Sequence, residues 1–243
     1  MTQELVGLYA RAVAALDTDT RAWVVGVALL EELAGPVPIP VGRVLERAIA
    51  DGTFPSGPFA VAPGEVDVEL AADGRSAEAT LEVAGERSYQ ARAGLDGRGV
   101  SAALTRSGLL DDGSVEPTHV MLSDVESVLV DIVAIAESLA AEIGYFGAVR
   151  VMVGIACAVP GQNLELRVYD ELCGDNLRPA AGYTHFEPIV LDYPGRLDEA
   201  AAEALRWENA VRIAHAFGVF LPQLVGQARA ISTISYRPSP HAG

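Results

Sequence analysis

Five residues in the last third of the chain are of types that could perform chemistry together. Cys173, Asp175, Tyr183, His185 and Glu187 fall in a predicted loop and at the entrance to a predicted strand. A thiol, an imidazole and a carboxylate make up a Cys-His-acid nucleophile, and zinc also prefers sulfur and nitrogen ligands. The candidates for catalysis are therefore Cys173, His185 and Glu187, and small-molecule hydrolysis is one alternative for the function.

The spacing of these residues argues against a metal site or an activated thiol. Fifteen residues separate Cys157 from Cys173 and eleven separate Cys173 from His185, which matches no familiar ligand pattern. Cys173 lies neither in a nucleophile elbow nor at an evident helix N-terminus that would lower the pKa of its thiol. We expect no metal and no cofactor, and the alternative to catalysis is a loop with a buried cysteine and a hydrogen-bonded histidine.

The remaining histidines and a glycine-rich stretch suggest structural roles. His119 lies in a predicted loop, His215 on the polar face of a predicted helix, and His241 in the tail. The stretch 94–100 contains three glycines but falls in a predicted hairpin, whereas a phosphate-binding loop joins a strand to a helix.

The charged residues exclude several classes of protein. The net charge is −16, and all 17 basic residues are arginines. Without lysine the chain can form neither a P-loop, nor a protein kinase site, nor the Schiff base of a pyridoxal enzyme. Binding to nucleic acid through phosphates needs a concentrated basic surface, so we expect no direct nucleic-acid binding.

An arginine-free stretch from Ser107 to Val149 concentrates negative charge. A solvated helix face is one interpretation of this stretch, and a docking surface for a basic partner is the other. Its acidic residues are Asp111, Asp112, Glu116, Asp124, Glu126, Asp131, Glu137 and Glu142.

The first half of the chain predicts a helix followed by strands. The region 3–16 has an apolar stripe at helical spacing, and Trp23–Leu30 is an apolar run without that spacing, which favours a buried strand. A short helix is expected over 41–50. Between 65 and 105 apolar and polar residues alternate, with turn signals at 73–74, 85–86 and 96–97, so we predict a four-stranded antiparallel meander.

The second half predicts two long helices around three strands. Ser123 and Glu126 have the spacing of a capping box, and the helix behind them runs to Gly144. Strands are expected over 150–158, 164–171 and 186–193 and form a second sheet of three strands. The last helix spans 198–217 and ends at Gly218, and small residues at 134, 136, 140 and 141 give the central helix a broad packing face.

The fold class is therefore α+β, with antiparallel sheets (a meander and a second three-stranded sheet) covered by long amphipathic helices. We expect an N-terminal half over 1–110, a C-terminal half over 120–225 and a disordered tail over 237–243. Trp23–Leu29 resembles Val151–Cys157, and each follows a predicted helix, which suggests duplicated halves. Apolar runs are too short to span a membrane and the N-terminus has no secretory signal, so a cytoplasmic location with reduced cysteines is expected.

Several segments of the second half resemble a known group of proteins. They are Ser123–Glu126, Val151–Gly154, Leu177–Pro179, Phe186–Pro188 and Phe217–Gly218. Together they are similar to the C-terminal, accessory region of bacterial AlbA-like or Schlafen-type DNA-binding proteins. In that family the nucleic-acid chemistry belongs to an N-terminal AlbA-like domain, which this chain is expected to lack, so the resemblance assigns no site.

These observations together favour a non-enzymatic interaction, assembly or regulatory module. Its expected partner is a protein or a second copy of the chain, as a homo-oligomer. The alternatives are the hydrolase that uses Cys173 and His185, and an accessory subunit of a nucleic-acid-handling AlbA-like protein.

Overall fold

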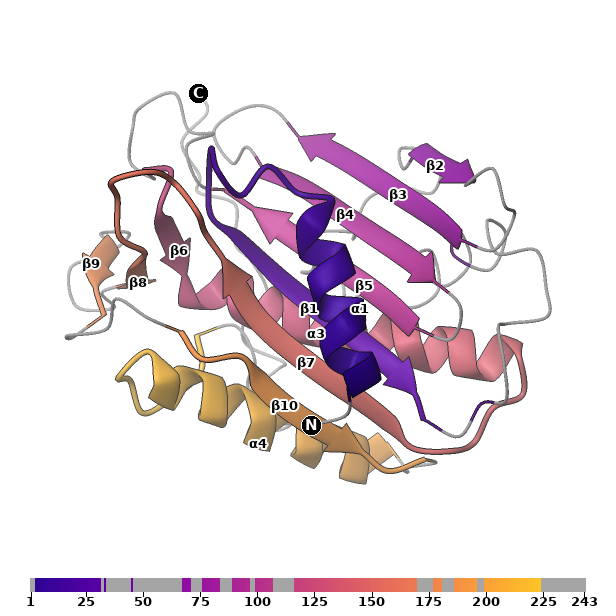
Figure 1. The fold of residues 1–243 in the computed structure, drawn as a ribbon. Helices are drawn as coiled ribbons and strands as arrows, with labels where there is room; N and C mark the ends of the chain where they lie inside the picture. Colours follow the sequence, from indigo (N-terminus) through magenta and orange to yellow (C-terminus); the bar gives the residue numbers. More distant parts are fainter. Residues whose placement is uncertain are drawn as a thin grey trace, which may run out of the picture.

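The described part of the chain combines three helices with two β-sheets (Figure 1). This computed structural model describes residues 3–31, 33, 45, 67–70, 76–83, 89–96, 99–106, 116–169, 177–180, 186–195 and 199–223. The helices are α1 (Gln3–Ala14), α3 (Leu122–Glu142) and α4 (Glu199–Ala216). The strands of the larger sheet are β1 (Trp23–Leu30), β2 (Asp67–Leu70), β3 (Ser76–Val83), β4 (Tyr89–Asp96), β5 (Gly99–Thr105), β7 (Val149–Ala156) and β10 (Ile189–Tyr193), and those of the smaller sheet are β6 (His119–Met121), β8 (Glu165–Tyr169) and β9 (Leu177–Pro179). None of the helices in these ranges is long and apolar enough to cross a membrane.

The larger sheet has seven antiparallel strands in the order β10-β7-β1-β5-β4-β3-β2. This confirms the α+β class, and β2 to β5 form the predicted meander. The predicted grouping of the last three strands is wrong, because β7 and β10 join the larger sheet beside β1. β8 pairs with β6 in parallel and with β9 in antiparallel orientation. The strands of both predicted halves thus hydrogen-bond into one sheet.

β1 lies in the middle of the larger sheet and is buried along its whole length. Trp23 and Val25 face α1, whereas Val24 and Ala28 face the main core against α3. Because successive residues of a strand point to opposite faces, a strand covered on both sides needs apolar residues at every position. This explains why Trp23–Leu30 shows no alternation.

The helices lie on both faces of this sheet (Figure 1). α3 and α4 share a hydrophobic core with one face, and α1 packs Leu5 and Leu8 against the other. The similarity between Trp23–Leu29 and Val151–Cys157 corresponds to one helix followed by one strand in each half. The elements that come after these two strands differ between the halves. β1 is followed by the meander, whereas the strands after β7 are divided between two sheets.

The beginning of α3 differs from the prediction. The N-cap residue is Met121, in extended conformation, and no side chain caps the helix. Ser123 lies inside the first turn, where its carbonyl accepts a hydrogen bond from Ser127 Oγ at 2.8 Å. The capping-box prediction is wrong because β6 runs directly into the helix, so the end of the strand determines where the helix begins.

Both long helices end as predicted, at glycines with positive φ. Gly144 has φ 66° and Gly218 has φ 72°. Tyr145 N–H donates to Ala140 O at 2.8 Å, and Val219 N–H donates to Ala214 O at 3.1 Å. These bonds complete a Schellman motif at each end, which requires the left-handed conformation that glycine adopts without strain.

The acidic residues of α3 are only partly solvated, since Glu137 and Glu142 are exposed and the other three are not. Asp124, Glu126 and Asp131 are buried, and Glu126 and Asp131 have no exposed surface. Arg106 Nε donates to Asp124 Oδ1 at 2.7 Å. Burial raises the pKa of Asp124, and the neighbouring Arg106 partly offsets this. Both interpretations of the arginine-free stretch are therefore wrong for these three residues, while Asp111 and Asp112 lie outside the described residues.

Other predictions also fall outside the described ranges. They are the turns at 73–74 and 85–86, most of the helix over 41–50, and the tail over 237–243. Leu45, the one described residue of that helix, is helical and buried in the main core.

Candidate functional site

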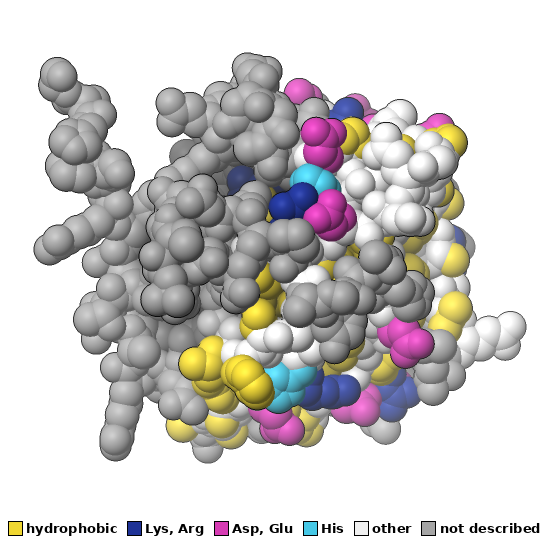
Figure 2. Space-filling model, turned by 90° about the vertical axis from the view of Figure 1, so that its left-hand side faces the viewer, with side chains coloured by type: hydrophobic (Ala, Val, Ile, Leu, Met, Phe, Trp, Pro, Cys, Tyr) yellow, Lys and Arg dark blue, Asp and Glu magenta, His cyan; other side chains and the backbone are white. Residues whose placement is uncertain are grey.

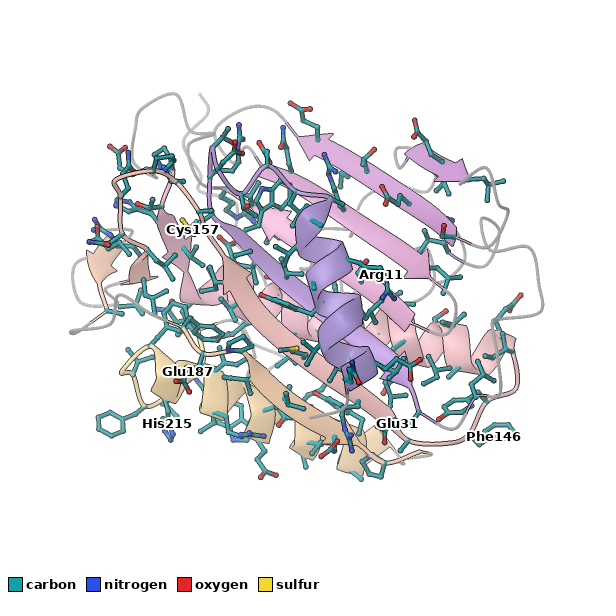
Figure 3. The ribbon with its side chains drawn as sticks, viewed as in Figure 1. Arg11, Glu31, Phe146, Cys157, Glu187 and His215 are labelled. Atoms are coloured by element: carbon teal, nitrogen blue, oxygen red, sulfur yellow. The ribbon has the colours of Figure 1, made fainter. Side chains whose placement is uncertain are left out.

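The predicted catalytic cluster lies mostly outside the described residues. Cys173 and His185 are both beyond them, and so are Asp175 and Tyr183. Glu187 is exposed and follows Phe186, whose ring centroid lies 5.8 Å from that of Phe217. Figure 3 places Glu187 near the end of α4 that carries His215, and Cys157 at the C-terminal end of β7. In the part of the chain that is described, no three His, Cys, Asp or Glu side chains come together as a metal site requires.

A second titratable cluster lies on the smaller sheet. Because β6 and β8 are parallel neighbours, His119 is directly opposite Glu165. His119 Nε2 lies 3.0 Å from Glu165 Oε2, and Arg167 Nη2 lies 2.8 Å from Glu165 Oε1. The sequence does not reveal these partners of His119, because Glu165 and Arg167 are distant along the chain.

The hydrogen bonds of His119 define its tautomer. Glu116 N–H donates to Nδ1 at 3.2 Å, so Nδ1 holds a lone pair and the neutral ring carries its proton on Nε2. Nε2 also lies 3.3 Å from Arg167 Nη2, but the closer contact is with Glu165 Oε2 at 3.0 Å, to which Nε2–H donates. A general base needs a nitrogen that can reach substrate, and both nitrogens of His119 are occupied within the protein. The arrangement joins the loop at Glu116 to the smaller sheet and does not favour proton transfer.

The His119 cluster predicts a dependence of stability on pH. Burial, together with the positive charge of Arg167, lowers the pKa of His119 below its ordinary value of 6.5. The unfolded chain therefore takes up a proton that the folded chain excludes, and the free energy of unfolding falls as the pH drops below about 6.5. Urea denaturation at about pH 7.5 and 5.5 should show a smaller fall for His119→Asn than for the unaltered protein.

The control for this comparison is His215→Asn, which removes an imidazole from the exposed side of α4 and leaves the His119 cluster intact. An unchanged fall in His119→Asn would show that other groups cause the pH dependence.

An apolar projection follows α4. The side chains of Phe220 and Leu221 are 87% and 64% exposed. Figure 2, which views the side of the molecule where α4 ends, shows exposed hydrophobic side chains grouped beside a histidine. We call these two residues the Phe220–Leu221 tip.

The tip is held on both sides. The Schellman motif at Gly218 fixes the chain before it, where Val219 packs against the main core. After the tip, Gln223 N–H donates at 2.8 Å to Oε1 of the buried Glu126. Because its conformation is fixed, the tip would lose little conformational entropy on binding a partner.

An apolar groove of about 230 Å³ lies at the other end of α4. It is formed by the C-terminal half of α3, the loop after α3 and the residues that follow β10, and Glu137 lies at its edge. Ala136, Ala140 and Ala141, three of the small residues expected to give α3 a broad packing face, line it together with Phe146, whose side chain is 59% exposed.

Neither the tip nor the groove was identified as a site from the sequence. Phe220 and Leu221 are ordinary apolar residues after a helix, and only their exposure distinguishes them. Comparison of the chain with protein-family models, with curated proteins and with solved structures finds no match.

Proposed function

We propose that the chain is a non-enzymatic interaction module that assembles with copies of itself through the Phe220–Leu221 tip. The single observation that carries this proposal is the exposure of a large aromatic and an aliphatic side chain on a segment held at both ends. Aromatic side chains that fill a pocket in the partner are the main source of affinity in protein interfaces.

The groove beside Phe146 is the surface that receives the tip. Its volume of about 230 Å³ accommodates an aromatic side chain. α4 has 18 residues and is therefore about 27 Å long, so the tip cannot reach the groove of its own chain. A contact between two different surfaces of the same chain builds rings or open filaments.

Substitution of the tip tests this proposal. The double variant Phe220→Ser/Leu221→Ser should be monomeric in analytical ultracentrifugation, whereas the unaltered chain sediments as an oligomer. The matched control is Leu70→Ser on the edge strand β2, since the Leu70 side chain is 63% exposed, close to the value for Leu221. A monomeric unaltered chain, or an oligomeric double variant, would contradict self-association through the tip.

A mixing experiment tests the pairing of tip with groove. Ala140→Phe fills the groove and leaves the tip intact, so this variant should also be monomeric. An equimolar mixture of the tip variant and the groove variant retains one intact contact and should form dimers and nothing larger. If the mixture stays monomeric while the unaltered chain assembles, the tip binds elsewhere.

The alternative function, a hydrolase that uses Cys173 and His185, predicts a different effect of substitutions at these two residues. Cys173→Ala and His185→Ala should leave assembly and the cellular phenotype intact if the chain is an interaction module. Loss of the phenotype in these two variants, with assembly preserved, would favour an enzyme.

A further inference from the structure

A second groove, lined by apolar and polar side chains together, lies on the face of the larger sheet that carries α1. Its volume is about 220 Å³, and it lies between α1 and strands β3 to β5. The polar groups that line it are Ser76, Glu78, Arg92, Ser101 and Arg11. Figure 3 places Arg11 on the flank of α1 that faces β4 and β5.

The groove exists because one short helix cannot cover seven strands. α1 packs on β1, β5 and β7, and within the described ranges no helix packs closely on β3 and β4 at this face. Small side chains deepen the floor at this point. A Cβ atom on Gly94 would lie 2.7 Å from Ser101 Oγ, so the glycine makes room for that hydroxyl at the floor of the groove.

Arg92 brings a fixed positive charge into this groove. Its Nη1 donates to Ala15 O at 2.7 Å, and its Cζ lies 5.9 Å from the centroid of the Trp23 ring. These contacts orient the guanidinium but do not neutralise it, and no carboxylate of the described residues forms an ion pair with it. By contrast, Arg21, Arg106, Arg150, Arg167 and Arg206 all pair with carboxylates.

The other polar groups of the groove complete a set of donors and acceptors. Within the described ranges, the hydroxyls of Ser76 and Ser101 and the carboxylate of Glu78 make no hydrogen bond. Only one of the five N–H donors of Arg92 is used, so the planar group can still donate two parallel bonds to a carboxylate. Glu78 can accept a hydrogen bond from an N–H group of the same ligand.

We propose that this groove binds a small ligand that carries a carboxylate next to an N–H donor. Arg92 holds the carboxylate, Ser76 and Ser101 donate to its oxygens, and Glu78 accepts from the N–H group. A free amino acid and the C-terminal residue of a peptide both have this chemistry. The site is distinct from the Phe220–Leu221 tip and from the groove beside Phe146, so it does not rest on self-association.

Isothermal titration calorimetry of the full chain tests the proposal. The probes are free glutamate, free serine, a tripeptide with a free C-terminus and the same tripeptide with an amidated C-terminus. We expect saturable binding with Kd of about 1 mM or tighter for at least one carboxylate probe, and none for the amidated peptide. Binding of the free amino acids alone, or of the tripeptide alone, identifies the source of the ligand.

Two variants separate binding from stability. Gly94→Ala removes no charge, and its only close contact is the Ser101 hydroxyl, which must rotate away from the position in which it donates to the ligand. The variant should therefore fold normally and weaken binding at least about tenfold. Arg92→Lys keeps the charge but loses the planar fork, and a similar weakening is expected. The control is Arg21→Lys, outside the groove, which should bind as the unaltered chain does. If no probe binds, or if both groove variants bind as well as the control, the proposal is wrong.

Discussion

Phe217→Ala lowers the free energy of unfolding by about 3–5 kcal/mol, the range expected when a large aromatic side chain is removed from a core. Phe217 has no exposed surface, and its ring lies against Phe186 at 5.8 Å between centroids. The substitution leaves a cavity where the end of α4 meets the sheet. Urea denaturation followed by circular dichroism measures the loss.

The matched control is Phe220→Ala, which makes the same chemical change three residues later. Its side chain is 87% exposed, so at protein concentrations that keep the chain monomeric the free energy of unfolding should change by no more than about 0.5 kcal/mol. An equal loss in the two variants would mean that Phe217 does not pack as described.

Gly26→Ala is expected to cost about 1–3 kcal/mol, although alanine stiffens the unfolded chain and should by itself favour a strand. Gly26 lies on the face of β1 that α3 covers, and a Cβ atom there would lie 2.9 Å from Val128 Cγ1 and 3.1 Å from Ile132 Cγ2. Both neighbours are β-branched residues in a helix, where one rotamer dominates, so they cannot turn aside. Chemical denaturation gives the difference in stability directly.

Gly94→Ala is the matched control, because it changes the same residue type in the same sheet. Its nearest neighbour is a serine hydroxyl that rotates freely, so stability should stay the same or rise. A stable Gly26→Ala variant would show that α3 can move away from β1 at little cost.

The elements whose signal is local could be predicted from the sequence. The run Trp23–Leu30 has no polar residue, which is what a strand buried on both faces needs. Gly144 and Gly218 end their helices because the left-handed conformation depends on a single residue. The α+β class and the meander follow from such signals.

The arrangement of the strands could not be predicted in the same way. β7 lies beside β1, and β8 lies beside β6, through pairings between residues far apart in the chain. The apolar patterns of these strands are alike, so the pattern alone does not select the partner. For this reason the three C-terminal strands were assigned to one sheet, which the structure divides.

The burial of charged residues in the core could not be predicted from the sequence either, for a related reason. Asp124 and Glu126 look solvated in the sequence, but Arg106 and the backbone of Gln223 meet them in the core. Arg92 likewise lies in the groove only because β4 is beside β5, on which α1 packs. The residues that surround a charged group decide whether it has a structural or a functional role. Tertiary structure brings these residues together, so the sequence pattern alone cannot identify them.

The central position of β1 has a consequence for synthesis on the ribosome. β1 is made early, but one of its neighbours, β7, begins only at Val149 and the helix that covers its other face is α3. At about 5–20 residues per second, on the order of ten seconds pass before these elements emerge. During that time β1, which has no polar residue, lacks one edge partner and one covering layer, so its apolar surface is open to aggregation until β7 and α3 are made.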